Sequence, residues 1–219
     1  LQNIAGIRTP IDSIRFGRMN PRKVEMVSEI VTPLHYPIEK ALKNSSNLNA
    51  ESLLYLLGYT VNHGGNFRKN GIIALQQFVR KELNMDPKNV CNIDDGCGLC
   101  PDDKLTPQLL VAILEYTHKH KGLYQEVFTS LPLSGTDGTL HDRMLKPNVL
   151  GMIKAKTGTL TREGGISTLA GYYTASNGHS MIFAIMNNEC PVLDGRWWQD
   201  RFCDKALLPQ AKKAETRTK

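Results

Sequence analysis

Two short groups of polar residues in this chain of 219 residues could carry out chemistry on a substrate. The first group, Ser45-Ser46-Asn47, comes just before an apolar segment with helical spacing. The second group, Lys156-Thr157-Gly158-Thr159, lies within a pattern that is typical of a strand. A lysine and two hydroxyls around a strand glycine suit an anionic ligand, because the glycine lets a ligand approach the backbone closely.

Each group taken alone also has a purely structural interpretation. Ser45 and Asn47 can cap the following helix, because their side chains accept hydrogen bonds from free N–H groups at a helix N-terminus. Lys156 can be a solvated residue of an edge strand. In that strand, alternation places Lys156 on one face, and Thr157 and Thr159 on the other.

Hydrophobic periodicity predicts the elements that must position the two groups. Helical spacing extends over residues 38–44, 47–58, 71–84 and 107–121. Gly58 suits the C-terminal end of the second of these helices, and Thr106 suits the N-cap of the fourth. A polar loop is expected over residues 61–70.

The pattern then changes to a period of two. Strands are predicted at 152–160, 166–175 and 179–188, with a tight turn at Asn177-Gly178. A helix at 194–207 is expected to bury Trp197 and Trp198. Helices, a meander of three strands and a final helix predict an α+β fold, with an antiparallel sheet flanked by helices.

Composition and charge exclude several classes of protein. Apolar residues make up 41% and charged residues 22%, a globular balance. No run of 18 apolar residues exists, so a transmembrane helix is not predicted. The net charge is +6, and residues 211–219 hold much of the excess. No basic stripe is interleaved with aromatic residues, which excludes nucleic acid as a partner.

Five cysteines leave three alternatives open. An odd number in a chain of this length is not a disulfide framework. Cys91, Cys97 and Cys100 could form a local disulfide, contribute to a zinc site, or be small side chains in a glycine-rich loop. A structural zinc site needs a fourth ligand, and no second C-x-x-C or H-x-x-x-H supplies one. We therefore predict no metal and no cofactor.

The two polar groups together are far more specific than either alone. An S-x-N group followed by K-T-G is typical of serine β-lactamases and penicillin-binding proteins. The chain resembles the class C low-molecular-mass penicillin-binding proteins, which are D-alanyl-D-alanine carboxypeptidase/endopeptidases. The resemblance extends over nearly the whole chain, through SSNLNAESLLYLLG, DDGCGLCPDDKLTP, LPLSGTDGTL and AKTGTL. Cys97 stands where the family usually has serine.

This resemblance implies a reaction and a role for each matching residue. The family cleaves D-Ala-D-Ala in peptidoglycan stem peptides through an acyl-enzyme, outside the bacterial cytoplasm or in the periplasm. Ser45 would pass a proton to the leaving amine, Asn47 would hold the substrate amide, and Lys156 would supply positive charge. The hydroxyls of Thr157 and Thr159 would contact the terminal carboxylate. The N–H of Thr159 would form half of the oxyanion hole, and Gly158 would leave room for the substrate.

One departure from the family pattern matters most. The family's nucleophile lies in an S-x-x-K motif, and none of the serines of this sequence has a lysine three positions later. We therefore expect residues 1–208 to be the C-terminal part of a transpeptidase-like domain, followed by a basic, disordered tail at 209–219. The chain would then be a fragment, one half of a split enzyme, or an inactive half-domain. β-Lactams would inhibit it only together with the nucleophile segment.

The alternative function is a non-catalytic module on the same fold that binds cell-wall peptides or a partner. For either function, Ser45, Asn47 and Lys156 are expected to converge at one edge of the sheet. Arg143, Arg162 and His141 are weaker candidates that could lie near the site.

Overall fold

The computed structural model describes residues 17, 18, 20–25, 28–162, 164–174, 178 and 180–206. The chain divides into two compact units, residues 1–32 and 33–219. The first unit contains the 3-10 helix η2 (Pro21–Lys23), which Asn20 caps. The predicted boundary at 208 and the tail at 209–219 lie outside the described residues.

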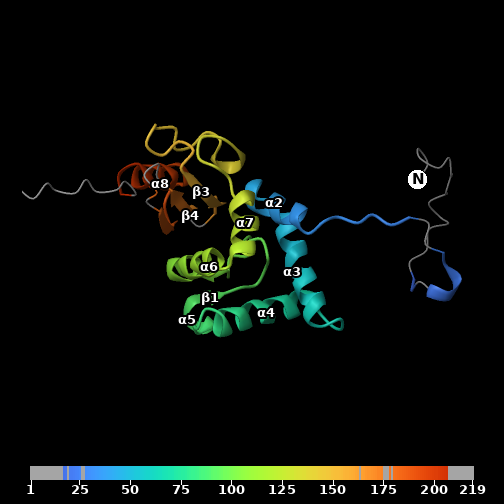
Figure 1. The fold of residues 1–219 in the computed structure, drawn as a ribbon. Coiled ribbons are helices and arrows are strands. Elements are labelled where there is room, and N and C mark those ends of the chain that lie inside the picture. The colour runs from blue at the N-terminus through green and yellow to red at the C-terminus, as the bar shows by residue number, and fades with distance from the viewer. Residues whose placement is uncertain are drawn as a thin grey trace, which may run out of the picture. The chain divides into compact units, whose positions relative to one another are not determined.

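The second unit follows the predicted broad order, from helices to a sheet to a last helix (Figure 1). The elements at residues 87–92, 104–105 and 121–130 were not predicted. The elements before the sheet are α2 (His35–Lys43), α3 (Asn47–Val61), α4 (Phe67–Lys81), α5 (Pro87–Val90), β1 (Cys91–Asn92), β2 (Lys104–Leu105), α6 (Pro107–Lys119), α7 (Lys121–Ser130) and η3 (Gly138–Leu140). Thr106 caps α6 as predicted. No helix among the described residues combines the length and the apolar character that crossing a bilayer requires.

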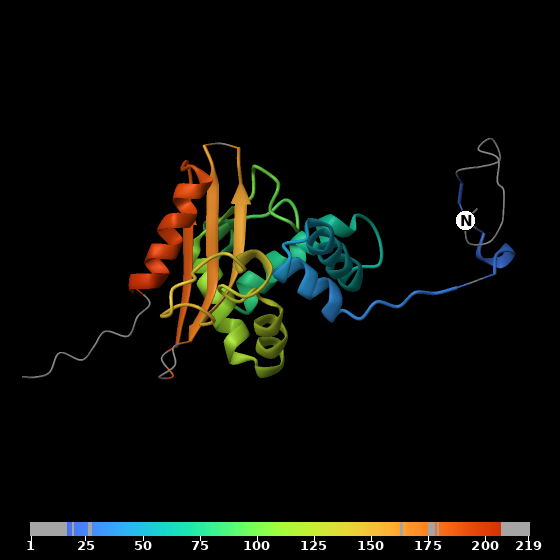
Figure 2. The same cartoon turned by 90° about the horizontal axis from the view of Figure 1, so that it is seen from above.

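The sheet that follows is an antiparallel meander. Strands β3 (Ile153–Leu160), β4 (Ile166–Thr174) and β5 (Ser180–Asn187) pair in the order β3-β4-β5, which confirms the three predicted strands. The turn predicted at Asn177-Gly178 falls largely outside the described residues. Helix α8 (Val192–Ala206) packs on β4, on the face opposite α6 and α7 (Figure 2).

Side chains of β3 and β4 alternate between the two faces of the sheet, and each face packs against different elements. Ile153 and Ala155 of β3 and Leu169 and Tyr173 of β4 are buried in the core on the α8 side. Tyr172 points to the other face, where its hydroxyl donates to the carbonyl oxygen of Leu114 in α6 at 2.9 Å. The sheet is therefore covered on both faces, which fixes its register.

Helices α3 and α4 cross at two glycines, and this corrects the prediction for Gly58. A Cβ on Gly58 would lie 1.8 Å from the carbonyl oxygen of Phe67, and a Cβ on Gly71 would lie 2.4 Å from that of Leu54. Helix α3 therefore continues through Gly58 to Val61, because the glycine allows close packing and does not end the helix. Helix α4 begins at Phe67, inside the predicted loop, because Asn66 caps it.

The prediction that α8 buries its two tryptophans is wrong. Trp197 is 50% exposed and Trp198 is 58% exposed, whereas Gln199 is fully buried. The Gln199 amide donates to Ser167 Oγ at 2.9 Å and to Asn187 Oδ1 at 3.2 Å. These two polar side chains of the sheet hold the Gln199 side of α8 inward, together with the buried Cys203, and the two tryptophans face outward.

Candidate active site at the open edge of the sheet

Ser46, and not Ser45, caps helix α3. Ser46 Oγ accepts from the N–H of Asn49 at 3.4 Å and from its side-chain amide at 2.8 Å. Ser45 lies one residue earlier, with a φ of +55° that non-glycine residues adopt only rarely. Its hydroxyl is therefore free of helix capping and is held in a turn between α2 and α3.

The structure brings Ser45 and Lys156 together, as the sequence predicts. Lys156 Nζ donates to Ser45 Oγ at 2.8 Å, although the two residues are 111 positions apart in the chain. Because an ammonium group can only donate, Ser45 accepts here and its own O–H remains available for another partner. Lys156 Nζ also donates to the carbonyl oxygen of Thr157 at 2.5 Å.

Burial changes the acidity of this lysine. Desolvation lowers the pKa of Lys156 from its ordinary value of 10.5 to about 8, because burial disfavours the charged form. The ammonium therefore still predominates at neutral pH. It supplies a positive charge that is less hydrated than that of a surface lysine.

Strand β3 lies at an edge of the described sheet, where its first residues pair with segment 132–134 and its residues beyond Ala155 leave the edge open. The N–H of Ala155 donates to the carbonyl oxygen of Pro132 at 3.2 Å, on the side away from β4. Backbone groups of an antiparallel strand alternate in direction with a period of two, and the register of β3 is unbroken to Leu160. The N–H of Thr159 therefore faces the same open edge, four residues further along.

The two threonines lie on the α8 face of β3, as alternation predicts. The hydroxyls of Thr157 and Thr139 are hydrogen-bonded at 2.8 Å. Arg196 Nη2, from α8, donates to Thr159 Oγ1 at 3.1 Å. Because a guanidinium cannot accept, the O–H of Thr159 is left free to donate. Lys156 and Arg196 thus flank the edge of β3 from its two faces.

Gly158 faces the opposite side of the strand from these threonines. A Cβ at this position would lie 2.3 Å from Thr168 Oγ1 on β4. The neighbouring strand therefore provides a reason for the glycine that is independent of any ligand.

Among the described residues, Asn47, Arg143, Arg162 and His141 form no side-chain hydrogen bond with Ser45 or Lys156. Asn47 is the first residue of α3 and is exposed, without a side-chain hydrogen bond to another described residue. Arg143 pairs with Asp200 at 2.6 Å and serves to hold α8. Arg162 is exposed, and His141 contacts Asp142 beside it. Arg196 was not identified from the sequence, because no local pattern links it to a strand 37 residues earlier.

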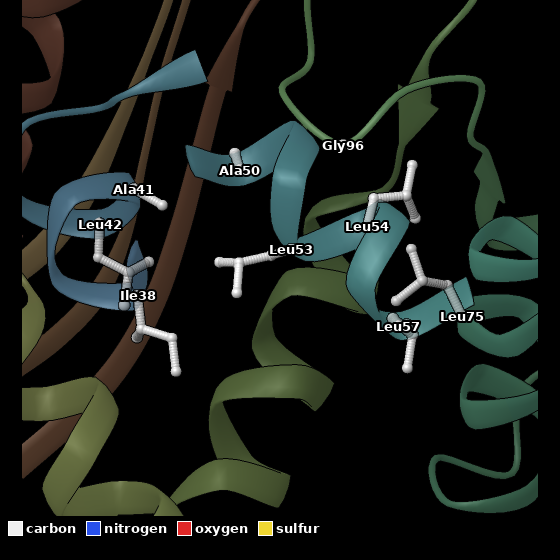
Figure 3. A pocket seen from close by; sticks show the side chains of 9 residues that line it. All are labelled: Ile38, Ala41, Leu42, Ala50, Leu53, Leu54, Leu57, Leu75 and Gly96. Atoms are coloured by element: carbon white, nitrogen blue, oxygen red, sulfur yellow. The ribbon is translucent and has the colours of Figure 1, made fainter. Parts of the chain in front are cut away.

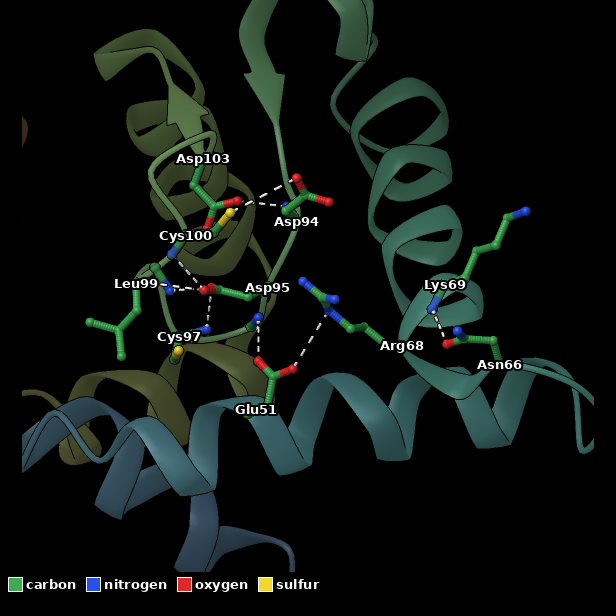
Figure 4. Close-up of polar contacts among 12 residues, drawn as sticks. Glu51, Asn66, Arg68, Lys69, Asp94, Asp95, Cys97, Leu99, Cys100 and Asp103 are labelled. Carbon is green, nitrogen blue, oxygen red and sulfur yellow. Dashed lines mark hydrogen bonds and ion pairs between the residues drawn. The ribbon is translucent and has the colours of Figure 1, made fainter.

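A loop built around Asp95 packs on α3 (Figure 4). The carboxylate of Asp95 accepts from four successive backbone N–H groups, those of residues 97–100, at 2.5–3.0 Å. Burial alone would raise the pKa of Asp95, but these donors, Gly98 and Cys100 foremost, hold it below its usual range. Glu51 of α3 accepts from the N–H of Gly96 at 2.7 Å, which ties the loop to the helix.

The cysteines of this loop are free thiols in the structure, as are the other three. The local disulfide that the sequence left open is therefore not formed. Cys97 lies with Glu51 and Asp95, and Cys100 with Asp94 and Asp102, so that in each group the ligand atoms are within 4.8 Å. The oxygens of Asp95 are already occupied by the loop backbone, which argues against their use as metal ligands.

An apolar pocket of about 310 Å³ opens between α2, α3 and α4 (Figure 3). Its lining is almost wholly aliphatic, and the residues are Ile38, Ala41, Leu42, Ala50, Leu53, Leu54, Leu57, Leu75 and Gly96. Helices α2 and α3 adjoin the turn that carries Ser45. The pocket contains no group that could act as a nucleophile.

Comparison with known proteins gives a consistent result. A model of the D-Ala-D-Ala carboxypeptidase 3 (S13) family matches residues 4–202. The penicillin-sensitive carboxypeptidase A of Dictyostelium discoideum is 29% identical over 193 residues, which is 84% of this chain and 35% of that protein. The D-alanyl-D-alanine carboxypeptidase of an Actinomadura species is 29% identical over 167 residues, which is 74% of this chain and 28% of that protein.

This chain is also similar to a solved structure. Penicillin binding protein 4 of Haemophilus influenzae, crystallised with a novel β-lactam, is 25% identical with a TM-score of 0.61, over 70% of this chain and 35% of its own. The fold is thus a partial penicillin-binding fold, and this chain spans about a third of the length of the relatives it matches. Because the family model extends over most of the sequence, the chain belongs to the D-Ala-D-Ala carboxypeptidase 3 (S13) family.

Proposed function

We propose that this chain supplies two of the three catalytic motifs of a serine-type D-alanyl-D-alanine carboxypeptidase/endopeptidase. The substrate is a peptidoglycan stem peptide that ends in D-Ala-D-Ala, and the reaction takes place outside the cytoplasm. A serine from an S-x-x-K segment, which this sequence does not contain, attacks the penultimate carbonyl. The peptide C–N bond breaks, the terminal D-Ala leaves as an amine, and water then hydrolyses the ester.

In this proposal Ser45 and Lys156 assist departure of the amine. Lys156 donates to Ser45 Oγ, so the serine proton points elsewhere and can pass to the leaving nitrogen. Asn47, at the start of α3, holds the substrate amide. The 2.8 Å contact between Ser45 and Lys156 carries the proposal, because it joins the two family motifs across 111 residues.

The edge of β3 binds the carbonyl oxygen of the scissile bond and the terminal carboxylate of the peptide. The N–H of Thr159 donates to the oxyanion, and its hydroxyl donates to the terminal carboxylate. The hydroxyl pair of Thr157 and Thr139 has two protons and uses one internally, so one remains for the same carboxylate. Gly158 keeps the strand open to the peptide. Lys156 and Arg196 supply the positive field on the two sides.

Labelling with penicillin tests this function. Intact-mass spectrometry should find no adduct on the 219-residue chain, because it has no placed nucleophile. A natural polypeptide extended upstream through an S-x-x-K should form a stoichiometric adduct. Ser45→Ala in that longer polypeptide should slow acylation by a factor on the order of 10² or more. An adduct on the short chain would overturn the missing-nucleophile proposal.

The absence of S-x-x-K from the sequence also favours a second candidate, a non-catalytic module that binds cell-wall peptides. Labelling of neither polypeptide, together with binding of acetyl-D-Ala-D-Ala to the short chain, would replace the enzyme proposal with this one.

A further inference from the structure

One turn of the chain contacts Lys43, beside the first motif, and Thr157, within the second. The turn consists of Asp137, which precedes η3, and of Gly138 and Thr139, the first two residues of η3. Segment 131–134 comes before it and pairs with the first residues of β3. The turn belongs to the segment LPLSGTDGTL, which resembles the family without containing either motif.

The first contact reaches the end of α2, two residues before Ser45. Asp137 Oδ2 pairs with Lys43 Nζ at 2.8 Å, and Asp137 Oδ1 accepts from the N–H of Leu133 at 2.8 Å. Gly138 has a φ of +52°, and a Cβ there would lie 2.4 Å from the carbonyl oxygen of Lys43. The turn therefore packs directly under the last residue of α2.

The second contact reaches β3, beside Lys156. The hydroxyls of Thr139 and Thr157 are hydrogen-bonded at 2.8 Å. The preceding segment pairs with the same strand, since the N–H of Ala155 donates to the carbonyl oxygen of Pro132. The turn is thus fixed to β3 at one end and to α2 at the other.

Such a bridge matters because the hydrogen bond between Lys156 and Ser45 is weak by itself. Ordering the lysine side chain costs conformational entropy, which offsets much of what the bond contributes. The contact, whose Ser45 side is exposed, therefore has little net energy with which to hold α2 and β3 in place. Ser45 also has a left-handed backbone that its surroundings must maintain.

We infer that Asp137 and Thr139 are positioning residues, which set the distance between the Ser45 hydroxyl and the Lys156 ammonium. That this distance matters for catalysis rests on the proposed function, whereas the effect of the two residues on the distance does not. Asp137 acts on the Ser45 side through Lys43. Thr139 acts on the Lys156 side through Thr157.

The test is an NMR measurement on the 219-residue chain. It compares the nuclear Overhauser effect between the Lys156 ε protons and the Ser45 β protons, together with the titration of Lys156, in wild type and variants. T139V and D137N should each reduce the Overhauser effect at least threefold and shift the pKa of Lys156 upward by half a unit or more, because the ammonium becomes better hydrated. Thr139→Ser, which keeps the hydroxyl, should restore both values.

Matched controls separate positioning from general damage. Thr129→Val removes a hydroxyl that bonds within α7, and Asp204→Asn removes a surface ion pair with Lys146. Neither should change the Ser45–Lys156 signal. Wild-type values in both T139V and D137N would overturn the inference, as would equal loss in the controls. Global unfolding of both variants would also overturn it, since the turn would then stabilise the whole fold. None of these readouts requires substrate, so failure of the penicillin test leaves them interpretable.

Discussion

Lys156 is the residue whose charge state matters most for the site. Its pKa of about 8 means that the ammonium loses its proton within an accessible pH range. Between pH 8 and 10.5 the unfolded chain binds more protons at this residue than the folded chain does, so its contribution to stability rises with pH across that window. The burial penalty is fully present below pH 8.

Titration of the lysine ε carbons by NMR should therefore show one resonance, identified by its absence in K156M, with a midpoint near pH 8. The free energy of unfolding of wild type relative to K156M should increase from pH 7 to pH 10. A midpoint near 10.5 for this resonance would contradict the burial that the structure shows.

Ser45 combines a functional hydroxyl with an unfavourable backbone. A left-handed conformation costs an L-residue about 1–2 kcal/mol, and glycine avoids most of that cost. Ser45→Gly and Ser45→Ala both remove the hydroxyl, but only the alanine variant keeps the strain. The glycine variant should therefore be more stable than the alanine variant by about 1 kcal/mol in urea denaturation. Equal stabilities would show that the turn relaxes away from its positive φ.

At the level of elements, local sequence patterns predicted the presence and order of the main helices and strands more accurately than the residues at which they end. The three strands were predicted correctly because each is a short run rich in β-branched and aromatic residues, bounded by turn residues, which a sequence shows directly. The end of α3 at Gly58 was wrong, since a glycine selected for helix packing has the same local appearance as a glycine that ends a helix. The cap predicted at Ser45 or Asn47 is provided instead by Ser46 between them, because neighbouring polar residues look alike as caps in the sequence.

The crossing of α3 and α4 gives a direct test of that correction. Gly58→Ala would place a methyl group 1.8 Å from the carbonyl oxygen of Phe67 and push the helices apart. Overpacking of this kind costs about 1–3 kcal/mol, which exceeds the gain of about 1 kcal/mol from replacing glycine by alanine in a helix. We expect a net loss of about 1 kcal/mol in the free energy of unfolding.

Gly122→Ala is the matched control, because the methyl group in α7 would have no neighbour within 4 Å. That variant should be as stable as wild type or slightly more stable. A neutral Gly58→Ala would mean that the helices do not pack as closely as the structure shows.

At the level of the whole molecule, the sequence predicted those site residues that belong to a family motif. It did not predict residues that reach the site only through the tertiary structure. Ser45 and Lys156 were identified because each belongs to a motif. Arg196 was missed because it reaches Thr159 from a helix whose orientation depends on the buried amide of Gln199. The exposure of Trp197 has the same origin, since burial of a polar residue on α8 could not be inferred from its hydrophobic pattern.

That orientation leaves an apolar surface on the outside of α8. Leu193, Trp197, Trp198 and Phe202 are all exposed on this helix, and the Trp197 and Trp198 rings contact each other edge to face at 4.7 Å. Burying a large apolar side chain contributes about 1.5–3 kcal/mol, so four of them favour association when nothing covers them. We expect the 219-residue chain to self-associate reversibly as its concentration rises, which sedimentation velocity would detect.

Replacing both tryptophans by serine should shift that equilibrium towards monomer at least tenfold, since even half the burial of two large side chains exceeds the 1.4 kcal/mol that a factor of ten requires. Leu123→Ser removes a single exposed apolar side chain from α7 and should leave association nearly unchanged. A monomeric wild-type chain at all concentrations would contradict the prediction. Association that survives the double replacement would place the contact elsewhere. The outer edge of β5 and the part of the β3 edge beyond Ala155 would then be the next surfaces to test, because open strands readily pair with other chains.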